Sequence, residues 1–247
     1  MFQKEILKTM IVCGGKLSEQ GWVDSLRNGS TGIGYTCESH LGIIENNRQE
    51  ADFRGLIEIK TKRAHCSSRL TLFTLSPKKS FISVAALAEK FGKYKNNKRT
   101  LYTTINGAGF NSCRNEFGFR LRVDWEIEQI HLDVLDLKSG VIIFTGTVFT
   151  FANLKKIVQR KLSYLCLFNA ETRVVNGIEQ FKYDSGCFYR LKGFSEFLKA
   201  IENGSVVMEL RVGVRADGTV HDHGTAWRVA KNKLACCFEC VDRNGLM

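Results

Sequence analysis

The feature that most constrains the fold is a strong alternation of apolar and polar residues between positions 117 and 150. Leu121 and Val123, for example, alternate with Arg120 and Arg122. Successive side chains of a strand point to opposite faces of a sheet, so this alternation predicts strands that each bury one face. Short turns separate the segments, and such turns join antiparallel strands. We therefore expect an antiparallel sheet in this part of the chain.

The rest of the chain mixes helical and strand patterns. Apolar residues at helical spacing predict helices at 2–12, 82–91, 154–162 and 194–201, and a further helix around Glu38; Gly14–Gly15 should end the first helix. Additional strands are expected at 54–61, 69–75, 164–168, 206–214 and 225–229, a short element at 21–26, and turns at 46–50, 138–140 and 216–219. The predicted fold class is α+β, or mixed α/β, arranged as two lobes around a cleft.

Length, charge and cysteine content limit the number of domains, the kind of partner and the cellular compartment that we expect. A chain of 247 residues is long enough for one or two domains with a sizeable core. The formal net charge of +11 favours an anionic partner, most simply DNA or RNA, although it also promotes solubility. Nine cysteines at irregular spacing fit a reducing cytoplasm better than a disulfide framework. No apolar stretch approaches the roughly 18 residues of a membrane span, and the N-terminal segment lacks a signal-peptide pattern. We expect a cytoplasmic protein without membrane contact.

A basic segment follows the predicted helix at 82–91. Cationic and aromatic side chains are interleaved there, at Lys90, Lys93, Tyr94, Lys95, Lys98, Arg99 and Tyr102. A run of this kind is able to follow a nucleic-acid backbone. A solvated helix end and loop would have the same composition, and the residues alone leave both interpretations open.

A candidate catalytic set lies in the first quarter of the chain. Asp52 precedes an apolar run that ends in Glu58-Ile59-Lys60. In a strand, Glu58 and Lys60 would share one face, while Ile57 and Ile59 would share the other. An aspartate followed by Glu-x-Lys is the working set of many Mg²⁺-dependent nucleases. The motif is short, and alternating Glu and Lys are also typical of a solvated strand face with cross-strand pairs.

The chemistry of phosphodiester hydrolysis explains these residue types. A hard cation held by carboxylates binds the scissile phosphate, polarises it and lowers the pKa of a bound water. Asp52 and Glu58 would hold the metal. Lys60 would orient or deprotonate the water, or stabilise the charge that develops at phosphorus. Glu38, from the preceding helix, would add a carboxylate beside this metal or bind a second one.

A second block near the C-terminus predicts contact with DNA bases. Arg211 and Arg228 fall on two strands of an expected hairpin, and arginine contacts guanine with two hydrogen bonds in the major groove, which a β-ribbon is able to enter. Glu209 shares a face with Arg211 and would accept a hydrogen bond from cytosine or hold the arginine. His221 and His223, in the loop, would reach base edges or phosphates.

Zinc is an alternative explanation for two short motifs. His221-x-His223 is a plausible pair of zinc ligands, but no third ligand is found at a suitable spacing. Cys237 and Cys240 form a similar isolated pair, and buried cysteines often serve only as small apolar residues.

Several sequence blocks occur together and in order. They are Thr31-Gly32-Ile33-Gly34, Glu38, Asp52-Phe53, Ile57-Glu58-Ile59-Lys60-Thr61, Leu70-Thr71-Leu72-Phe73-Thr74, Arg211-Val212-Gly213, and His221-Asp222-His223-Gly224-Thr225-Ala226-Trp227-Arg228. This combination, which extends from about Gly21 to Arg228, resembles the MvaI/BcnI family of type II restriction endonucleases, relatives of the mismatch-repair nickase MutH. A set of blocks of this extent is far more specific than the acidic motif alone.

The resemblance implies a restriction-endonuclease-like core, with a mixed sheet flanked by helices and two lobes around a DNA cleft. Residues 1–247 would form one endonuclease unit, with a catalytic core at about 22–75 and a DNA-recognition part at about 205–230. It implies catalytic roles for Glu38, Asp52, Glu58 and Lys60, with Mg²⁺, or Mn²⁺ in its place, bound by the three acids. It also implies recognition by Glu209, Arg211, Arg228 and the loop of His221 and His223.

The resemblance further implies a monomer that acts on double-stranded DNA. It would recognise a short CCNGG-like pseudo-palindrome, cut one strand at a time and leave 5′-phosphate ends. A cognate DNA methyltransferase would protect the host without binding the enzyme. Two positions depart from the family pattern: Glu209 replaces a common aspartate, and Leu75 replaces a common basic residue. Both bear on which sequence is recognised.

Two other functions fit the same residues. A MutH-like repair nickase would share the catalytic chemistry but depend on partner proteins. A catalytically dead, sequence-specific DNA-binding protein would keep the recognition block alone, although the intact acids and lysine argue against it. A generic RNA-binding domain fits only the charge.

Overall fold

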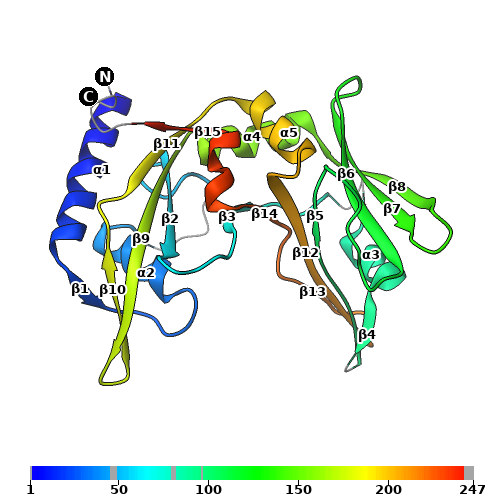
Figure 1. Ribbon diagram of the computed structural model, residues 1–247, viewed down its shortest axis with the longest axis horizontal. Coiled ribbons are helices and arrows are strands. Elements are labelled where there is room, and N and C mark those ends of the chain that lie inside the picture. The colour runs from blue at the N-terminus through cyan, green and yellow to red at the C-terminus, as the bar shows by residue number, and fades with distance from the viewer. Residues whose placement is uncertain (1, 45–48, 79–81, 96, 242–247) are drawn as a thin grey trace. The chain divides into compact units, whose positions relative to one another are not determined.

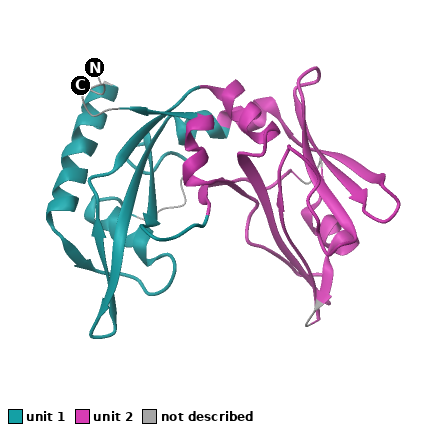
Figure 2. Cartoon of the chain, viewed as in Figure 1, with its two compact units in different colours: residues 1–68, 157–192, 238–247 teal, residues 69–156, 193–237 magenta. Residues whose placement is uncertain are grey.

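The computed structural model describes residues 2–44, 49–78, 82–95 and 97–241 (Figure 1). Most of the turn predicted at 46–50 falls in residues 45–48, outside the described residues. The chain forms two compact units, shown in different colours in Figure 2: unit 1 comprises residues 1–68, 157–192 and 238–247, and unit 2 comprises 69–156 and 193–237. The described elements make a mixed α+β fold, as predicted.

Unit 1 is built on a mixed six-stranded sheet. The strand order is β1-β10-β9-β11-β15, and β2 also pairs with β9. The strands are β1 (Trp22–Asp24), β2 (Ile57–Arg63), β9 (Tyr164–Val175), β10 (Ile178–Tyr183), β11 (Cys187–Leu191) and β15 (Phe238–Val241). β2 runs parallel to β9, whereas the other pairs are antiparallel. The short element predicted at 21–26 and the strands predicted at 54–61 and 164–168 are therefore confirmed, with β9 longer than expected.

The helices α1 (Phe2–Glu19) and α2 (Gly32–His40) share one hydrophobic core with this sheet. The core contains Ile6 and Met10 of α1, Ile33 and Cys37 of α2, Ile57 and Ile59 of β2, and Phe168 and Phe181 of the long hairpin. Burial of both isoleucines of β2 confirms that this strand turns its apolar face inward. Glu58 and Lys60 consequently project from the opposite face.

The first helix is longer than predicted. Gly14 and Gly15 do not end it, because α1 continues to Glu19 and buries Leu17. A side chain at position 14 would place its Cβ 2.8 Å from the carbonyl oxygen of Ser185 and 3.4 Å from the ring of Phe168. Gly14 therefore permits a close approach between helix and sheet. In this helix the tertiary contact outweighs the low helix propensity of glycine.

Unit 2 contains a six-stranded antiparallel sheet, here called sheet B, in the order β3-β14-β12-β5-β4, with β13 also paired to β12. Its strands are β3 (Leu70–Thr74), β4 (Lys93–Lys95), β5 (Lys98–Ile105), β12 (Val206–Arg215), β13 (Val220–Asp222) and β14 (Ala226–Val229). The helices of this unit are α3 (Val84–Phe91), α5 (Phe194–Glu202) and the 3₁₀-helix η1 (Lys231–Cys236). Helix α4 (Phe151–Leu162) carries the chain from unit 2 into unit 1.

The alternating region forms a separate three-stranded sheet in unit 2, in the order β6-β7-β8. Its strands are β6 (Phe117–Asp124), β7 (Gln129–Asp136) and β8 (Val141–Thr150), and both pairs are antiparallel, as predicted. The Asp136 carboxylate accepts hydrogen bonds from the backbone N–H groups of Lys138 and Ser139, which fixes the expected turn before β8.

The core of unit 2 is centred on Trp227, which is fully buried. Its ring lies near Phe73 of β3, Phe149 of β8 and Phe197 of α5, with centroid separations of 6.1, 5.5 and 6.3 Å. Trp227 thereby anchors β14 and fixes the backbone of the neighbouring Arg228. None of the helices in the described part of the chain combines the length and apolar character that a membrane crossing requires.

Candidate functional site

Asp52 is positioned by a tight turn before β2. Phe53 and Ile57 form a small antiparallel bridge, and Arg54 and Gly55 take positive φ angles of 51° and 69° to close it. The turn folds Asp52 back onto the strand, where its Oδ2 accepts a hydrogen bond of 3.0 Å from the backbone N–H of Ile59. Asp52 is consequently held beside the segment that carries Glu58 and Lys60.

Glu58 lies between two lysines. Its side chain is only 2% exposed, and Lys60 Nζ donates a 2.6 Å hydrogen bond to its Oε1. Lys161 of α4, with 20% of its side chain exposed, places its Nζ 3.6 Å from the same oxygen. The other oxygen, Oε2, is buried and has no hydrogen-bond partner among the described residues. An unsatisfied buried carboxylate oxygen is costly and marks a place where a cation would be stabilised.

The pKa shifts show how strongly these groups interact. Burial raises the pKa of Glu58; Lys60 opposes this rise, and the negative charge of Asp52 adds to it. Burial lowers the pKa of Lys60, but Glu58 and Asp52, with a smaller contribution from Glu38, outweigh burial and raise that pKa overall. Lys60 is therefore held in its cationic form.

Glu38 is brought to the same region by α2, where glycine is required for a steric reason. A Cβ at Gly32 would lie 2.3 Å from the backbone carbonyl oxygen of Arg27, a distance that no side chain tolerates. A Cβ at Gly34 would stand 3.6 Å from Thr61 Oγ1 of β2. Of the two glycines only Gly32 is required sterically, because the 3.6 Å approach at Gly34 is an ordinary van der Waals contact. Glu38 of this helix is near enough to affect the pKa of Lys60.

The four predicted catalytic residues are therefore neighbours within unit 1. The described residues contain no cluster of three or more His, Cys, Asp or Glu side chains arranged to hold a metal ion, so Glu38 does not complete a three-carboxylate site there. The donor set still fits a hard divalent cation, because Asp52 and Glu58 are oxygen ligands and Glu58 Oε2 is buried without a partner. In this arrangement the principal ligands would be Asp52 and Glu58.

Sequence reasoning missed Lys161, although the sequence contains a signal for it. Leu154, Ile157, Val158 and Leu162 form the apolar stripe of α4, and position 161 belongs to the same i, i+3, i+4, i+7 series. A lysine within an apolar stripe needs a buried or half-buried partner. Its partner, Glu58, is about a hundred residues earlier in the chain, so the pairing required the structure.

In unit 2, Arg228 of β14 is bound by Glu209 of β12. Arg228 Nη1 donates to both carboxylate oxygens of Glu209, at 2.9 and 2.8 Å, and its Nη2 donates to the backbone oxygen of Arg69 at 2.7 Å. Thr104 of β5 donates to Glu209 Oε1 at 3.5 Å. Of the two roles expected for Glu209, contact with cytosine or a hold on Arg211, the second falls to a different arginine, because the structure pairs Glu209 with Arg228.

Arg211 is instead bound by the loop between β13 and β14. Its Nη2 donates to the backbone oxygens of His223 and Gly224, both at 3.1 Å, and its Nε donates to Gly224 at 3.3 Å. The exposed rings of His221 and His223 pack edge to face, with centroids 4.3 Å apart, and the His223 ring lies 6.3 Å from that of Tyr102. His223 thus lies beside Arg211 in this loop, whereas His221, expected in the loop, belongs to β13 and lies opposite Gly213.

All five predicted recognition residues belong to one region of unit 2. Glu209 and Arg211 alternate with the buried Leu210 and Val212, so they share the polar face of sheet B. We call this the recognition face, made up of Thr104, Tyr102, Glu209, Arg211 and Arg228 with the His221–His223 loop. The predicted hairpin differs in one respect, because the short strand β13 intervenes before the return strand β14.

The zinc alternatives find no support among the described residues. No cluster of three possible ligands includes the histidine pair or Cys237 and Cys240. Cys237 is fully buried, whereas Cys240 is exposed on β15. The two sulfur atoms thus belong to different environments.

Comparison with known proteins identifies the class. A family model that describes restriction endonucleases, which are DNA nucleases, matches residues 15–238. The chain belongs to the MvaI/BcnI restriction endonuclease family. This agrees with the resemblance found in the sequence blocks.

Solved structures give the same result over nearly the whole chain. A structure of the restriction endonuclease MvaI in complex with its cognate DNA substrate is 30% identical, covers 96% of this chain and 97% of that chain, and has a TM-score of 0.85. A structure of MvaI in the absence of DNA is 27% identical, covers 96% of each chain and has a TM-score of 0.62. A comparison with curated proteins finds no match.

Proposed function

We propose that this protein is a Mg²⁺-dependent type II restriction endonuclease that hydrolyses duplex DNA at a short, specific site. The observation that carries the proposal is the buried carboxylate of Glu58, held between two lysines beside Asp52, with one oxygen lacking a partner. Membership of a restriction endonuclease family supplies the substrate class. Mn²⁺ is expected to substitute for Mg²⁺, because both accept oxygen ligands.

Each residue of the site has a chemical role in this proposal. Asp52 and Glu58 would hold the metal ion, which when bound neutralises phosphate charge and lowers the pKa of water. Lys60, cationic at neutral pH, stabilises the charge that develops on the phosphorane oxygens and orients the attacking water. Lys161 adds a second positive charge beside Glu58 and opposes the rise in the pKa of this carboxylate that burial causes. Glu38 reinforces the positive charge of Lys60.

The recognition face would contact base edges in the major groove. Arg211 and Arg228 are held in fixed orientations by protein acceptors, which reduces the entropy lost when they contact guanine. Glu209 is saturated by Arg228, so its role is to orient that arginine. We propose a CCNGG-like pseudo-palindromic target, contacted by one monomer that cuts the strands in turn and leaves 5′-phosphate and 3′-hydroxyl ends.

The test is digestion of unmethylated plasmid DNA with Mg²⁺, followed by sequencing of the ends. Discrete fragments that share one short motif are expected from the wild type and are not expected with EDTA. Asp52→Ala should abolish cutting but retain binding, whereas Asp24→Asn, which removes a carboxylate on β1 of the same unit, should cut normally. Normal cutting by Asp52→Ala would refute the site assignment. Nicking that needs a partner protein would indicate a repair nickase, and binding without cleavage would indicate a dead nuclease core.

A further inference from the structure

The polar face of sheet B extends beyond the recognition face. Arg211 of β12 lies directly opposite Tyr102 of β5, and four residues further along β12, Arg215 lies opposite Lys98. Alternate residues of a strand share a face, and so do directly opposed residues of an antiparallel pair. Arg215 and Lys98 therefore project on the same side as Arg211.

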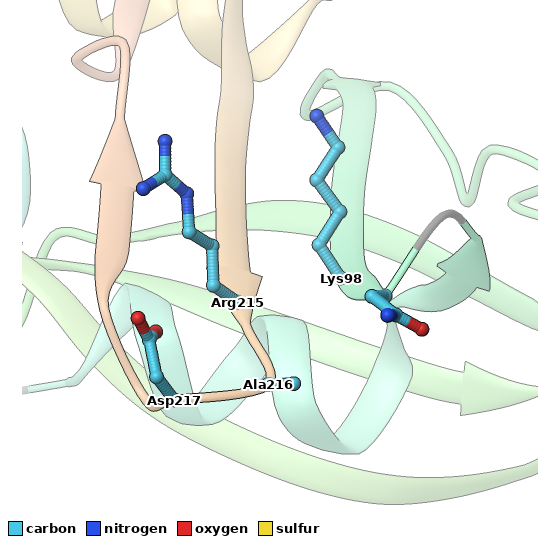
Figure 3. Close-up of a pocket in the computed structure, with 5 residues that line it drawn as sticks. Lys98, Arg215, Ala216 and Asp217 are labelled. Carbon is cyan, nitrogen blue, oxygen red and sulfur yellow. The ribbon is translucent and has the colours of Figure 1, made fainter.

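At this end of sheet B two cationic side chains lie directly opposite each other. Figure 3 shows the side chains of Lys98 and Arg215 extending side by side in the same direction, from a cavity of about 430 Å³ that Asn97, Ala216 and Asp217 also line. Within the described part of the chain neither cation forms an ion pair closer than 4.0 Å. Like charges placed directly opposite each other are destabilising. The arrangement therefore favours an anion that neutralises both.

The one acid in this cavity shapes it without cancelling its charge. Asp217 accepts a 2.8 Å hydrogen bond from the backbone N–H of Thr219, in a turn that Arg215 closes by donating its own N–H to the Thr219 oxygen. That hydrogen bond from Thr219 is the main cause of the lowered pKa of Asp217, and Arg215 contributes less. Two cations and one carboxylate leave the cavity positive.

A third cation extends the same positive region. A row of paired residues crosses the four strands β4, β5, β12 and β13 in the order Lys93, Thr100, Gly213 and His221. This row crosses the polar face between Arg211 and Arg215, and its two end residues, Lys93 and His221, are exposed. The basic segment of the sequence is thus part of a sheet face that continues the recognition face, which favours phosphate contact over a solvated loop.

We propose that Lys93, Lys98 and Arg215, here called the flank site, bind a backbone phosphate of the DNA duplex outside the recognised bases. This inference rests on the proposed function. Four residues of a strand span roughly 14 Å at about 3.4 Å per residue, which equals about four base pairs of DNA. Contacts of this kind fix the register and strengthen binding without reading sequence.

The test compares two double variants with the same change in charge. Lys98→Ala/Arg215→Ala removes the opposed pair, while Lys138→Ala/Lys155→Ala removes two exposed lysines of unit 2 outside sheet B. Binding of a cognate duplex is measured with Ca²⁺ at several salt concentrations. Loss of two phosphate contacts should make the slope of log affinity against log salt less steep by about 1.8. The ratio of wild-type affinity to variant affinity should therefore fall about 12-fold between about 50 and 200 mM salt. The control should keep the wild-type slope.

A second arm identifies where the phosphate lies. The wild type should bind a duplex with six added flanking base pairs more tightly than one trimmed to the target, and the Lys98→Ala/Arg215→Ala variant should lose this gain. Discrimination against single-base mismatches should stay unchanged. Inorganic phosphate should inhibit DNA binding by the wild type and by the Lys98→Ala/Arg215→Ala variant to the same extent. If it inhibits the wild type more strongly, and the affinity does not depend on the length of the flanking duplex, the cavity binds free phosphate instead.

The two proposals fail in different ways. If the wild type binds no duplex, the proposed function is wrong. If the wild type binds and cuts, but the variant retains the full salt slope and flank gain, or the control loses as much, the flank site alone is wrong. Thermal unfolding of each variant verifies folding, and Lys98→Gln/Arg215→Gln replaces any alanine variant that unfolds earlier.

Discussion

Glu58 of the candidate active site in unit 1 is a buried carboxylate that is incompletely satisfied, whereas Glu209 of the recognition face in unit 2 is a carboxylate with both oxygens bound. Glu58 keeps one oxygen without a donor, although two lysines lie beside the other. Glu209 instead has both oxygens bound by Arg228. An unsatisfied carboxylate prepares a site for a cation, and a satisfied ion pair orients a side chain for contact with a partner.

The largest effect should follow from neutralising Glu58. Glu58→Gln keeps the shape but removes the metal-binding charge, so cleavage should fall by about a thousandfold or more, equivalent to roughly 4 kcal/mol of barrier. Metal-free DNA binding should change little, because Glu58 is not part of the recognition face. The measurement is single-turnover cleavage beside a binding titration in EDTA. Glu179→Gln, which breaks the ion pair with Arg63, is the control and should cut at a near-normal rate.

The next prediction compares the stability of two alanine variants, one at Gly32 in unit 1 and one at Gly213 in unit 2. Gly32→Ala would force a methyl group against the Arg27 carbonyl at 2.3 Å, and overpacking of this kind should cost about 1–3 kcal/mol of folding free energy. Gly213→Ala, on the polar face of sheet B, would meet its nearest atom at an ordinary 3.7 Å and should fold normally. Urea unfolding checks both. Equal stabilities would show that α2 does not need its close packing.

Weakening the ion pair of the recognition face should affect specificity more than rate. Glu209→Gln leaves Arg228 with a neutral partner and a less fixed orientation. Discrimination between the cognate site and single-base variants should drop by about 10- to 100-fold, the 1–3 kcal/mol of one bidentate base contact. Competition between two substrates in one digest measures this ratio. Glu196→Gln, in an exposed pair with Lys199, should leave it unaltered.

The smallest expected effect concerns Lys161. Lys161→Met removes one positive charge beside Glu58, and kcat should fall about tenfold, or roughly 1.4 kcal/mol, while DNA affinity is maintained. Lys161→Arg should recover most of the rate because it restores the charge. Rates measured at saturating DNA over a range of Mg²⁺ concentrations separate this role from metal binding. If arginine and methionine variants are equally impaired, then Lys161 acts through packing and not through charge.

Local patterns in the sequence account for much of this structure. The alternation at 117–150 and the Glu58-Ile59-Lys60 strand are set by neighbouring residues, so periodicity reveals them. The strands β10 and β11 were not predicted, although Asn176–Gly177, with φ angles of 50° and 79°, is a strong hairpin signal. Missing that turn also concealed the full length of β9.

Other features were beyond the reach of sequence patterns because they depend on register. The contact of Lys161 with Glu58 follows from α4 and from the parallel pairing of β2 with β9. The opposition of Lys98 and Arg215 follows from the alignment of β5 with β12. No local signal fixes which strand pairs with which, and a shift of one residue would reverse every face.

The parallel pairing of β2 with β9 also has a consequence for the life of the protein in the cell. Glu58 lies beside Leu165 in this pairing, so residues from the first quarter of the chain must wait for a partner made about a hundred residues later. Contacts of such sequence separation form late and slowly in folding. A nascent chain that already contains Asp52, Glu58 and Lys60 therefore lacks the sheet that holds them. The candidate site can therefore form only after the chain has been synthesised through β9.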